Sequence, residues 1–274
     1  MLFLRSWTII LLVGCFAYGQ IPGIQARREP TGHPISKPLP RRFIGVDPVT
    51  IYRGLLSATQ NDRAEAYSHL ADKVSDMSGP GDARIYAVNL DSDADLEYVL
   101  LVSDYAGISR TNAFVFDRDA RGWWVVGEFR YSWHWDTNEA ERFVGLREII
   151  WPGRKEIIVR DYGGGTGVAE TGLSIYRMHD GYLYRVFHMT EDAFYFIIGA
   201  GRAKYEHRTI EYPEHYENDP VFLTVHYEKR LEADPRGRPA REVRSCSVFR
   251  WDATRFLFGE DKLAPAKLCV NQRR

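Results

Sequence analysis

The 274-residue sequence lacks features that define several large protein classes. Its 36 lysines and arginines stand against 37 aspartates and glutamates, so the basic excess expected of a nucleic-acid-binding chain is missing. Beyond Gly19 no run is apolar enough for a transmembrane helix, which needs about 20 such residues. The sequence therefore predicts neither a nucleic-acid partner nor a transmembrane helix.

Motifs for catalysis are also scarce. No serine stands in a Gly-x-Ser-x-Gly context, and His207, His215 and His226 match no short zinc motif. The segment Gly163–Gly167 has the glycines of a nucleotide loop, but no Lys-Ser/Thr follows it and it leads into a strand-like run. We interpret it as a loop between strands that could face a ligand.

The N-terminus has the layout of an export signal. Met1–Gly19 carries one positive charge, Arg5, followed by an apolar stretch and then small residues. Two endings stay open: an ordinary signal-peptidase site before Gln20, or a bacterial lipobox in which Cys15 is acylated. Either ending predicts an extracellular, periplasmic or outer-surface protein, and only the second adds a lipid anchor.

The exported chain divides into four segments: a proline-rich basic linker at 20–42, a helical segment at 43–80, a β-repeat domain at 81–258 and a C-terminal tail at 259–274. The composition of the linker predicts an extended, solvated stretch. Within the helical segment, Asp47-Pro48 marks the start of a helix, and apolar spacing predicts a second helix over 61–77.

The sequence has three cysteines, which allow at most one disulfide bond within the chain. If Cys15 is cleaved off or acylated, Cys246 and Cys269 remain as a pair in an exported protein, where disulfides form and persist. A bond between them stabilises the fold by about 3 kcal/mol when only chain entropy is counted. Two buried free thiols are the alternative.

One short segment carries an oxygen-bearing side chain at every second position: Asn89, Asp91, Asp93, Asp95 and Glu97. Ca²⁺ takes about six to eight oxygen ligands from carboxylates, amides and carbonyls, and without a cation these carboxylates repel one another. An EF-hand is excluded, because counting from Asp91 places Leu96 at the required glycine and Val102 at the required glutamate. The alternative is a solvated acidic edge that discourages pairing with other chains.

The segment resembles the loop of FG-GAP or VCBS repeats in integrin-like β-propellers, which reads Asp-x-Asp/Asn-Gly-Asp-Gly-x-x-Asp/Glu before an apolar strand. The family's side-chain ligand positions are held here by Asn89, Asp91, Asp93 and Glu97. Asp95 falls where the family offers a backbone carbonyl, while Ser92 and Ala94 replace its two glycines. The resemblance implies one bound Ca²⁺ and a blade-like β fold.

From Arg84 onward the chain repeats with a period of about 60 residues. Glu97–Tyr105 aligns with Glu156–Tyr162, and a loop and a strand–turn–strand follow each. A third copy, over 221–258, lacks the alternating carboxylates. The pattern predicts a mainly β fold of three blade-like, four-stranded antiparallel meanders, open or partly propeller-like, with an N-terminal helical segment.

Two clusters are candidates for a ligand surface: Trp133, Trp135 and Asp136, and the glycines Gly163, Gly164 and Gly165. Strand alternation would place both tryptophans on one face, as a platform for a sugar or peptide, or as packing between repeats.

The sequence thus predicts an exported, non-enzymatic binding or structural protein that has an unidentified protein or glycan partner and a structural Ca²⁺ in its first repeat. One alternative is a secreted hydrolase acting on glycan or peptide, with Asp136, Asp161 or Glu170 as acid or base. A structural envelope component without a metal is the other.

Overall fold

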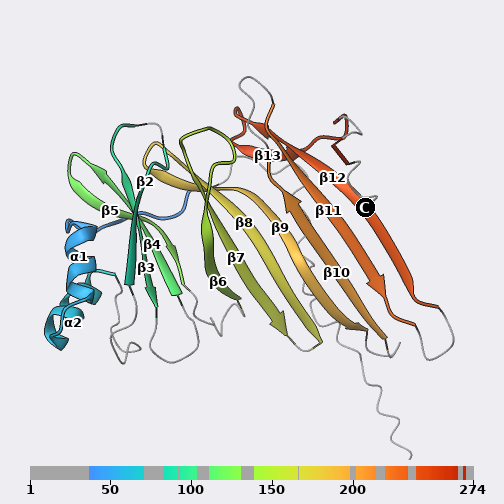
Figure 1. The fold of residues 1–274 in the computed structure, drawn as a ribbon, viewed down its shortest axis with the longest axis horizontal. Coiled ribbons are helices and arrows are strands. Elements are labelled where there is room, and N and C mark those ends of the chain that lie inside the picture. The colour runs from blue at the N-terminus through green and yellow to red at the C-terminus, as the bar shows by residue number, and fades with distance from the viewer. Residues whose placement is uncertain are drawn as a thin grey trace, which may run out of the picture. The chain divides into compact units, whose positions relative to one another are not determined.

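The computed structural model describes residues 37–70, 83–91, 93–103, 111–130, 139–165, 167–197, 202–213, 220–233, 239–264 and 268–269 (Figure 1). The predicted export signal with Cys15, and the cluster of Trp133, Trp135 and Asp136, lie outside these ranges. Within them, no helix has both the length and the apolar character needed to cross a membrane.

The described residues form two short helices and thirteen strands, so the mainly β prediction is confirmed. The helices are α1 (Pro48–Leu55) and α2 (Gln60–Ser68). The strands are β1 (Arg42–Phe43), β2 (Ala83–Val88), β3 (Glu97–Ser103), β4 (Thr111–Asp119), β5 (Gly122–Phe129), β6 (Glu139–Arg147), β7 (Glu156–Gly165), β8 (Val168–His179), β9 (Tyr182–Ile197), β10 (Arg202–Glu211), β11 (Phe222–Leu231), β12 (Arg241–Asp252) and β13 (Leu257–Glu260).

The strands form two open antiparallel sheets, ordered β1-β5-β4-β3-β2 and β13-β12-β11-β10-β9-β8-β7-β6 (Figure 1). We divide β2–β13 into three groups of four, β2–β5, β6–β9 and β10–β13. The third predicted copy, over 221–258, covers only β11–β13 of the last group. The second and third groups are not separate blades, because β9 pairs with β8 along one edge and with β10 along the other. Strand β9, 16 residues long, therefore continues one sheet through both groups.

Helix α1 begins where the sequence predicted, and α2 ends earlier than predicted. Asp47 caps α1 by accepting a hydrogen bond from the backbone N–H of Val49 at 2.9 Å, with proline in the first turn. Helix α2 ends at Ser68, short of the predicted end at Met77, and residues 71–82 lie outside the described ranges. The Arg42 guanidinium donates to the two carbonyls that follow this helix end, both at 2.9 Å, so these acceptors are bound.

The last residues of the predicted linker belong to the folded part of the chain. Leu39 donates its backbone N–H to the carbonyl of Leu183 at 2.8 Å. The Arg41 guanidinium lies over the rings of Trp124 and Tyr182, at 4.7 and 4.8 Å from their centroids. The solvated linker predicted up to residue 42 therefore does not extend that far.

Apolar side chains join the two sheets. One buried cluster combines Val99 and Val115 of the first sheet with Ile157 and Val159 of the second. A second cluster packs α1 and α2 on the first sheet, with Ile51 among the fully buried side chains. Each such residue contributes about 1.5–3 kcal/mol by leaving water, so the first and second strand groups form a common core.

Candidate metal centre

The acidic segment forms the connection between β2 and β3, as the sequence predicted. Val88 and Glu97 are paired in the register of β2 and β3, so the two ends of the loop lie directly opposite each other on neighbouring strands. Inside the loop, Asp91 Oδ1 accepts the backbone N–H of Asp93 at 2.9 Å, and Asp93 Oδ1 accepts that of Asp95 at 2.8 Å. These two Asx turns fix the backbone and leave the second carboxylate oxygen of each aspartate outside the turn bonds.

Three carboxylates of this loop converge. One carboxylate oxygen from each of Asp91, Asp93 and Glu97 lies within 4.8 Å of the other two. Asp91 is 8 % exposed and Glu97 only 1 %, while Asp93 is exposed. The side-chain oxygen of Asn89 is buried and has no hydrogen-bond partner among the described residues. A set of donors consisting only of oxygen fits Ca²⁺, which would also use the unpaired amide oxygen.

Asp95 does not belong with these side chains. It was a predicted metal residue, yet it is exposed and is not part of the carboxylate cluster found in the described residues. Its backbone N–H serves the Asx turn of Asp93. In the family pattern this position contributes its backbone carbonyl, so an Asp95 carboxylate outside the cluster agrees with that pattern.

The cluster is electrostatically unfavourable without a cation. The pKa of Glu97 is raised to about 8, first by burial and then by the neighbouring carboxylates of Asp91 and Asp117. The backbone N–H of Leu90, which donates to the Glu97 carboxylate, acts in the opposite direction and lowers this pKa. Burial also raises the pKa of Asp91 and brings that of Asp117 to about 6. A bound cation would reverse these shifts by favouring the charged forms.

Asp117 is a further acidic residue of the site that the sequence did not predict. In the register of β3 and β4, Tyr98 pairs with Phe116, so Asp117 is one step further along and stands opposite Glu97. It is 5 % exposed, and its Oδ2 lies 3.8 Å from a guanidinium nitrogen of Arg41. In the repeat alignment, Asp117 of the first copy occupies the position of Arg177 in the second. This change from a basic to an acidic residue could have indicated that Asp117 belongs to the site.

The second strand group has the same arrangement around Glu156. This residue opens β7, is fully buried, and accepts the backbone N–H groups of Ile149 and Ile150 at 2.8 and 3.3 Å. Ile157 pairs with Tyr176, so Arg177 stands opposite Glu156, and the two side chains form a buried ion pair. The Arg177 guanidinium lowers the pKa of Glu156, although burial outweighs it and the pKa is raised overall. In this group the positive charge beside the carboxylate comes from a side chain.

The acidic loop contacts the connection between β6 and β7, which we call the second loop. Lys155 of the second loop donates its backbone N–H to the carbonyl of Asn89 at 3.0 Å. The charge of Arg154 lowers the pKa of Asp91, although burial outweighs it. The second loop therefore places a positive charge beside the acidic cluster.

The other acids of the hydrolase alternative have local partners. Asp161 Oδ2 lies 3.6 Å from Nδ1 of His188. A Cβ on Gly172 would fall 1.9 Å from the other oxygen of Asp161, so only glycine leaves room for this carboxylate. Glu170 accepts a hydrogen bond from the hydroxyl of Tyr195 at 2.6 Å. Asp136 lies outside the described residues.

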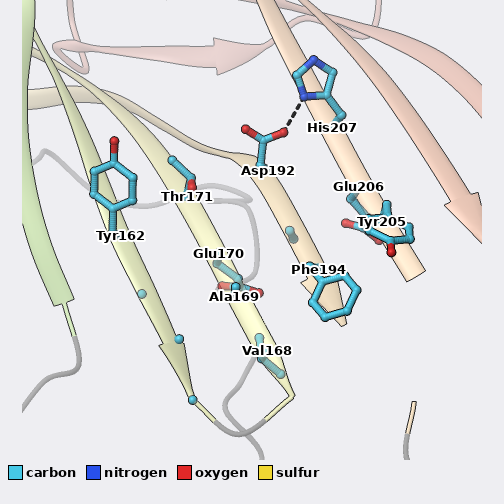
Figure 2. A pocket seen from close by; sticks show the side chains of 14 residues that line it. Tyr162, Val168, Ala169, Glu170, Thr171, Asp192, Phe194, Tyr205, Glu206 and His207 are labelled. Atoms are coloured by element: carbon cyan, nitrogen blue, oxygen red, sulfur yellow. Dashed lines mark hydrogen bonds and ion pairs between the residues drawn. The ribbon is translucent and has the colours of Figure 1, made fainter. Parts of the chain in front are cut away.

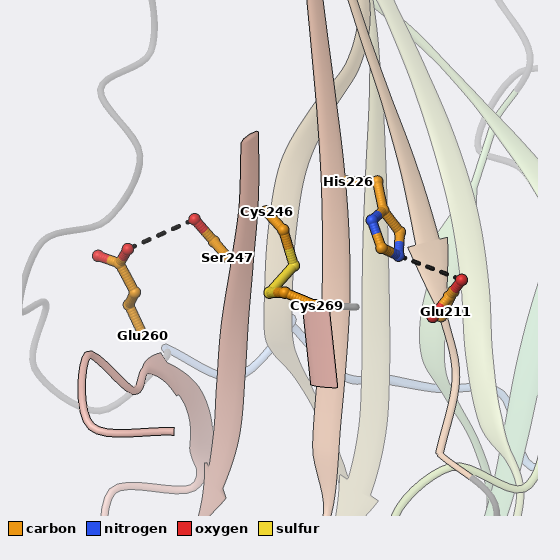
Figure 3. The surroundings of a disulfide bond; sticks show 6 residues. All are labelled: Glu211, His226, Cys246, Ser247, Glu260 and Cys269. Carbon is orange, nitrogen blue, oxygen red and sulfur yellow. Dashed lines mark hydrogen bonds and ion pairs between the residues drawn. A yellow bond between two sulfur atoms is a disulfide. The ribbon is translucent and has the colours of Figure 1, made fainter. Parts of the chain in front are cut away.

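The predicted cysteine pair is confirmed. The Sγ atoms of Cys246 on β12 and Cys269 lie 2.01 Å apart, at disulfide distance (Figure 3). Nearby, His226 lies 3.1 Å from a carboxylate oxygen of Glu211. This bond ties the C-terminal tail to the second sheet.

The predicted glycine loop lies at the end of β7. Gly163, Gly164 and Gly165 line a groove of about 710 Å³ that extends across four strands (Figure 2). The groove is separate in sequence from the acidic loop.

Comparisons with protein-family models, curated proteins and solved structures found no match to this chain. The resemblance to FG-GAP or VCBS repeats therefore stays a prediction based on the residues of the acidic loop.

Proposed function

We propose that this chain is an exported, non-enzymatic β-repeat protein with a binding or structural role, whose first strand group holds one structural Ca²⁺. The observation that carries the proposal is the convergence of the Asp91, Asp93 and Glu97 carboxylates within 4.8 Å, with two of them buried. The unpaired, buried oxygen of Asn89 points to the same conclusion, because buried polar atoms rarely lack a partner.

The loop would supply the amide of Asn89 and the carboxylates of Asp91, Asp93 and Glu97. Asp117, on the strand paired with β3, is not one of the three converging carboxylates, but its buried charge adds to the negative potential at the site. Bound Ca²⁺ would neutralise these charges and hold the β2–β3 connection in place. Because Glu97 is almost completely buried, this is the chemistry of a structural ion and not of a substrate site.

Export rests on the pattern of Met1–Gly19, and the Cys246–Cys269 pair is in keeping with an oxidising compartment. Mass spectrometry of the exported protein distinguishes the two signal endings. An acylated Cys15 at the mature N-terminus would indicate a lipoprotein, and a chain starting at Gln20 would indicate a protein without that anchor.

The calcium proposal is tested by thermal unfolding of the mature protein in millimolar Ca²⁺ and in excess chelator. An ion present at 100 times its Kd adds about 2.7 kcal/mol, which corresponds to a rise in Tm of roughly 5–10 °C for a chain of this size. Replacing both Asp91 and Asp93 with alanine should remove this rise. Equal unfolding temperatures in Ca²⁺ and chelator would refute the proposal.

Asp261→Ala is the matched control. Asp261 makes the same kind of Asx turn, accepting the N–H of Leu263 at 2.9 Å, but it is not part of the acidic cluster. Its variant should lose a little stability and keep the full response to Ca²⁺, which separates loss of a turn bond from loss of a ligand.

A further inference from the structure

The second sheet carries a groove that the calcium proposal does not use. Its volume of about 710 Å³ falls within the range typical of small-molecule sites, about 300–1,000 Å³. It lies across the ends of β7, β8, β9 and β10, and the side chains that line it project from these strands (Figure 2).

One row of the groove is polar. In the register, Tyr162 pairs with Thr171, Thr171 with Asp192, and Asp192 with His207. Directly paired residues of antiparallel strands point to the same face, so these four side chains form a line across the sheet. Asp192 and His207 bind each other through Oδ1 and Nδ1, and both side chains are more than half exposed. The row offers hydroxyl, carboxylate and imidazole groups to a ligand.

A parallel row, two residues further along, is apolar. It consists of Gly164, Ala169, Phe194 and Tyr205, which are paired in the same way. Gly164 and Ala169 have no bulky side chain and make a low floor. Phe194 and Tyr205 form a wall, with ring centroids 5.1 Å apart and Tyr205 41 % exposed.

The lining disfavours two kinds of ligand. An anion would meet the exposed carboxylate of Asp192, and the imidazole of His207 beside it is already bound to that carboxylate. A peptide could not add as an extra strand here, because β8 and β9 are paired along both edges and their backbone groups are already used. What the groove offers is aromatic faces beside a line of side-chain hydrogen-bonding groups.

We propose that this groove binds a neutral oligosaccharide. The C–H face of a sugar ring packs on Phe194 and Tyr205, whose rings provide large apolar contact at small entropic cost. The hydroxyl groups on the ring edge bind Thr171, Asp192 and His207, which lie in the adjacent row. The site shares no residue with the acidic loop, so its occupancy is independent of the calcium proposal.

The test is binding of the labelled mature protein to an array of immobilised neutral and acidic oligosaccharides, in Ca²⁺ and in chelator. Tyr205→Ala should lower retention on neutral glycans at least tenfold, and Ala169→Trp, which fills the exposed floor, should do the same. Tyr86→Ala is the matched control, because Tyr86 is also 41 % exposed but lies on β2 of the other sheet. Circular dichroism checks that each variant is folded.

Retention on neutral glycans by the wild type and Tyr86→Ala, and its loss in the two groove variants, would support the proposal. Retention on no neutral glycan, retention on acidic glycans alone, or equal retention by Tyr205→Ala would overturn it. Glycan binding without a thermal response to Ca²⁺ would refute only the calcium proposal, and the reverse result would refute only this one.

Discussion

The first and second strand groups bury the same carboxylate in the same way and neutralise it differently. Glu97 and Glu156 each accept a backbone N–H from the residue seven positions earlier, Leu90 and Ile149. Opposite Glu156 stands Arg177, which forms a buried ion pair with it. Opposite Glu97 the chain has another acid, Asp117, and the loop adds further carboxylates.

This difference shows two solutions to one electrostatic problem. A buried carboxylate is costly unless a positive charge accompanies it. The second group carries its cation covalently, as the guanidinium of Arg177. In our account the first group takes its cation from solution. The stability of the first group should therefore depend on Ca²⁺ and pH, and that of the second should not depend on Ca²⁺.

The largest expected effect comes from removing the built-in cation. Arg177→Ala leaves Glu156 buried and unpaired, which should lower the free energy of unfolding by about 3–5 kcal/mol in urea denaturation. The control is Arg244→Ala, because Arg244 pairs with Glu242 at 2.7 Å but is 59 % exposed, and such pairs contribute about 1 kcal/mol or less. If the free energy of unfolding fell by the same small amount in both variants, the claim that buried Glu156 depends on Arg177 would be contradicted.

The same substitution should have opposite effects in the two groups. Glu156→Gln removes the partner of a buried guanidinium and should cost about 2–3 kcal/mol. Glu97→Gln, measured in chelator at pH 9, removes an unneutralised charge and should leave stability equal to or above that of the wild type. In Ca²⁺ it should weaken the thermal response, because a ligand is lost. Destabilisation by Glu97→Gln in chelator, to the extent seen for Glu156→Gln, would contradict the comparison.

A smaller effect is expected from pH. Since the folded pKa of Glu97 is about 8, above its ordinary value, the native state binds this proton more tightly than the unfolded chain does. In chelator the free energy of unfolding should fall as pH rises from about 5 to 8, by roughly 1–2 kcal/mol after relaxation of the native site. In saturating Ca²⁺ the ion displaces the proton and the decline should be largely offset. Urea unfolding at several pH values measures both curves.

The parts of the site that depend on local spacing could be predicted from sequence. Asp91, Asp93 and Glu97 lie within one loop, so their alternation was enough to bring them together. Asp117 could not be placed in this way, because its position opposite Glu97 depends on the register between β3 and β4. The charge change from Arg177 to Asp117 in the repeat alignment was the available signal.

The fold shows the same division between local and long-range information. Apolar runs and turns in the sequence predicted β3–β5, β7–β9 and β11–β13, whereas β10 lies outside the third predicted copy. The joining of the second and third groups into one sheet depends on pairing between β9 and β10, which the strand pattern alone does not specify. The early end of α2 involves Arg42, 27 residues before His69, whose carbonyl it binds.

The most direct test of the central claim is calorimetric titration of Ca²⁺ into the mature protein at pH 7, repeated in buffers of different ionisation enthalpy. The account predicts one ion per chain and release of protons on binding, because Glu97, with a pKa of about 8, must lose its proton to bind the ion. The Asp91→Ala/Asp93→Ala variant should give no binding heat. Absence of binding in the wild-type protein, or unchanged binding in this variant, would contradict the account.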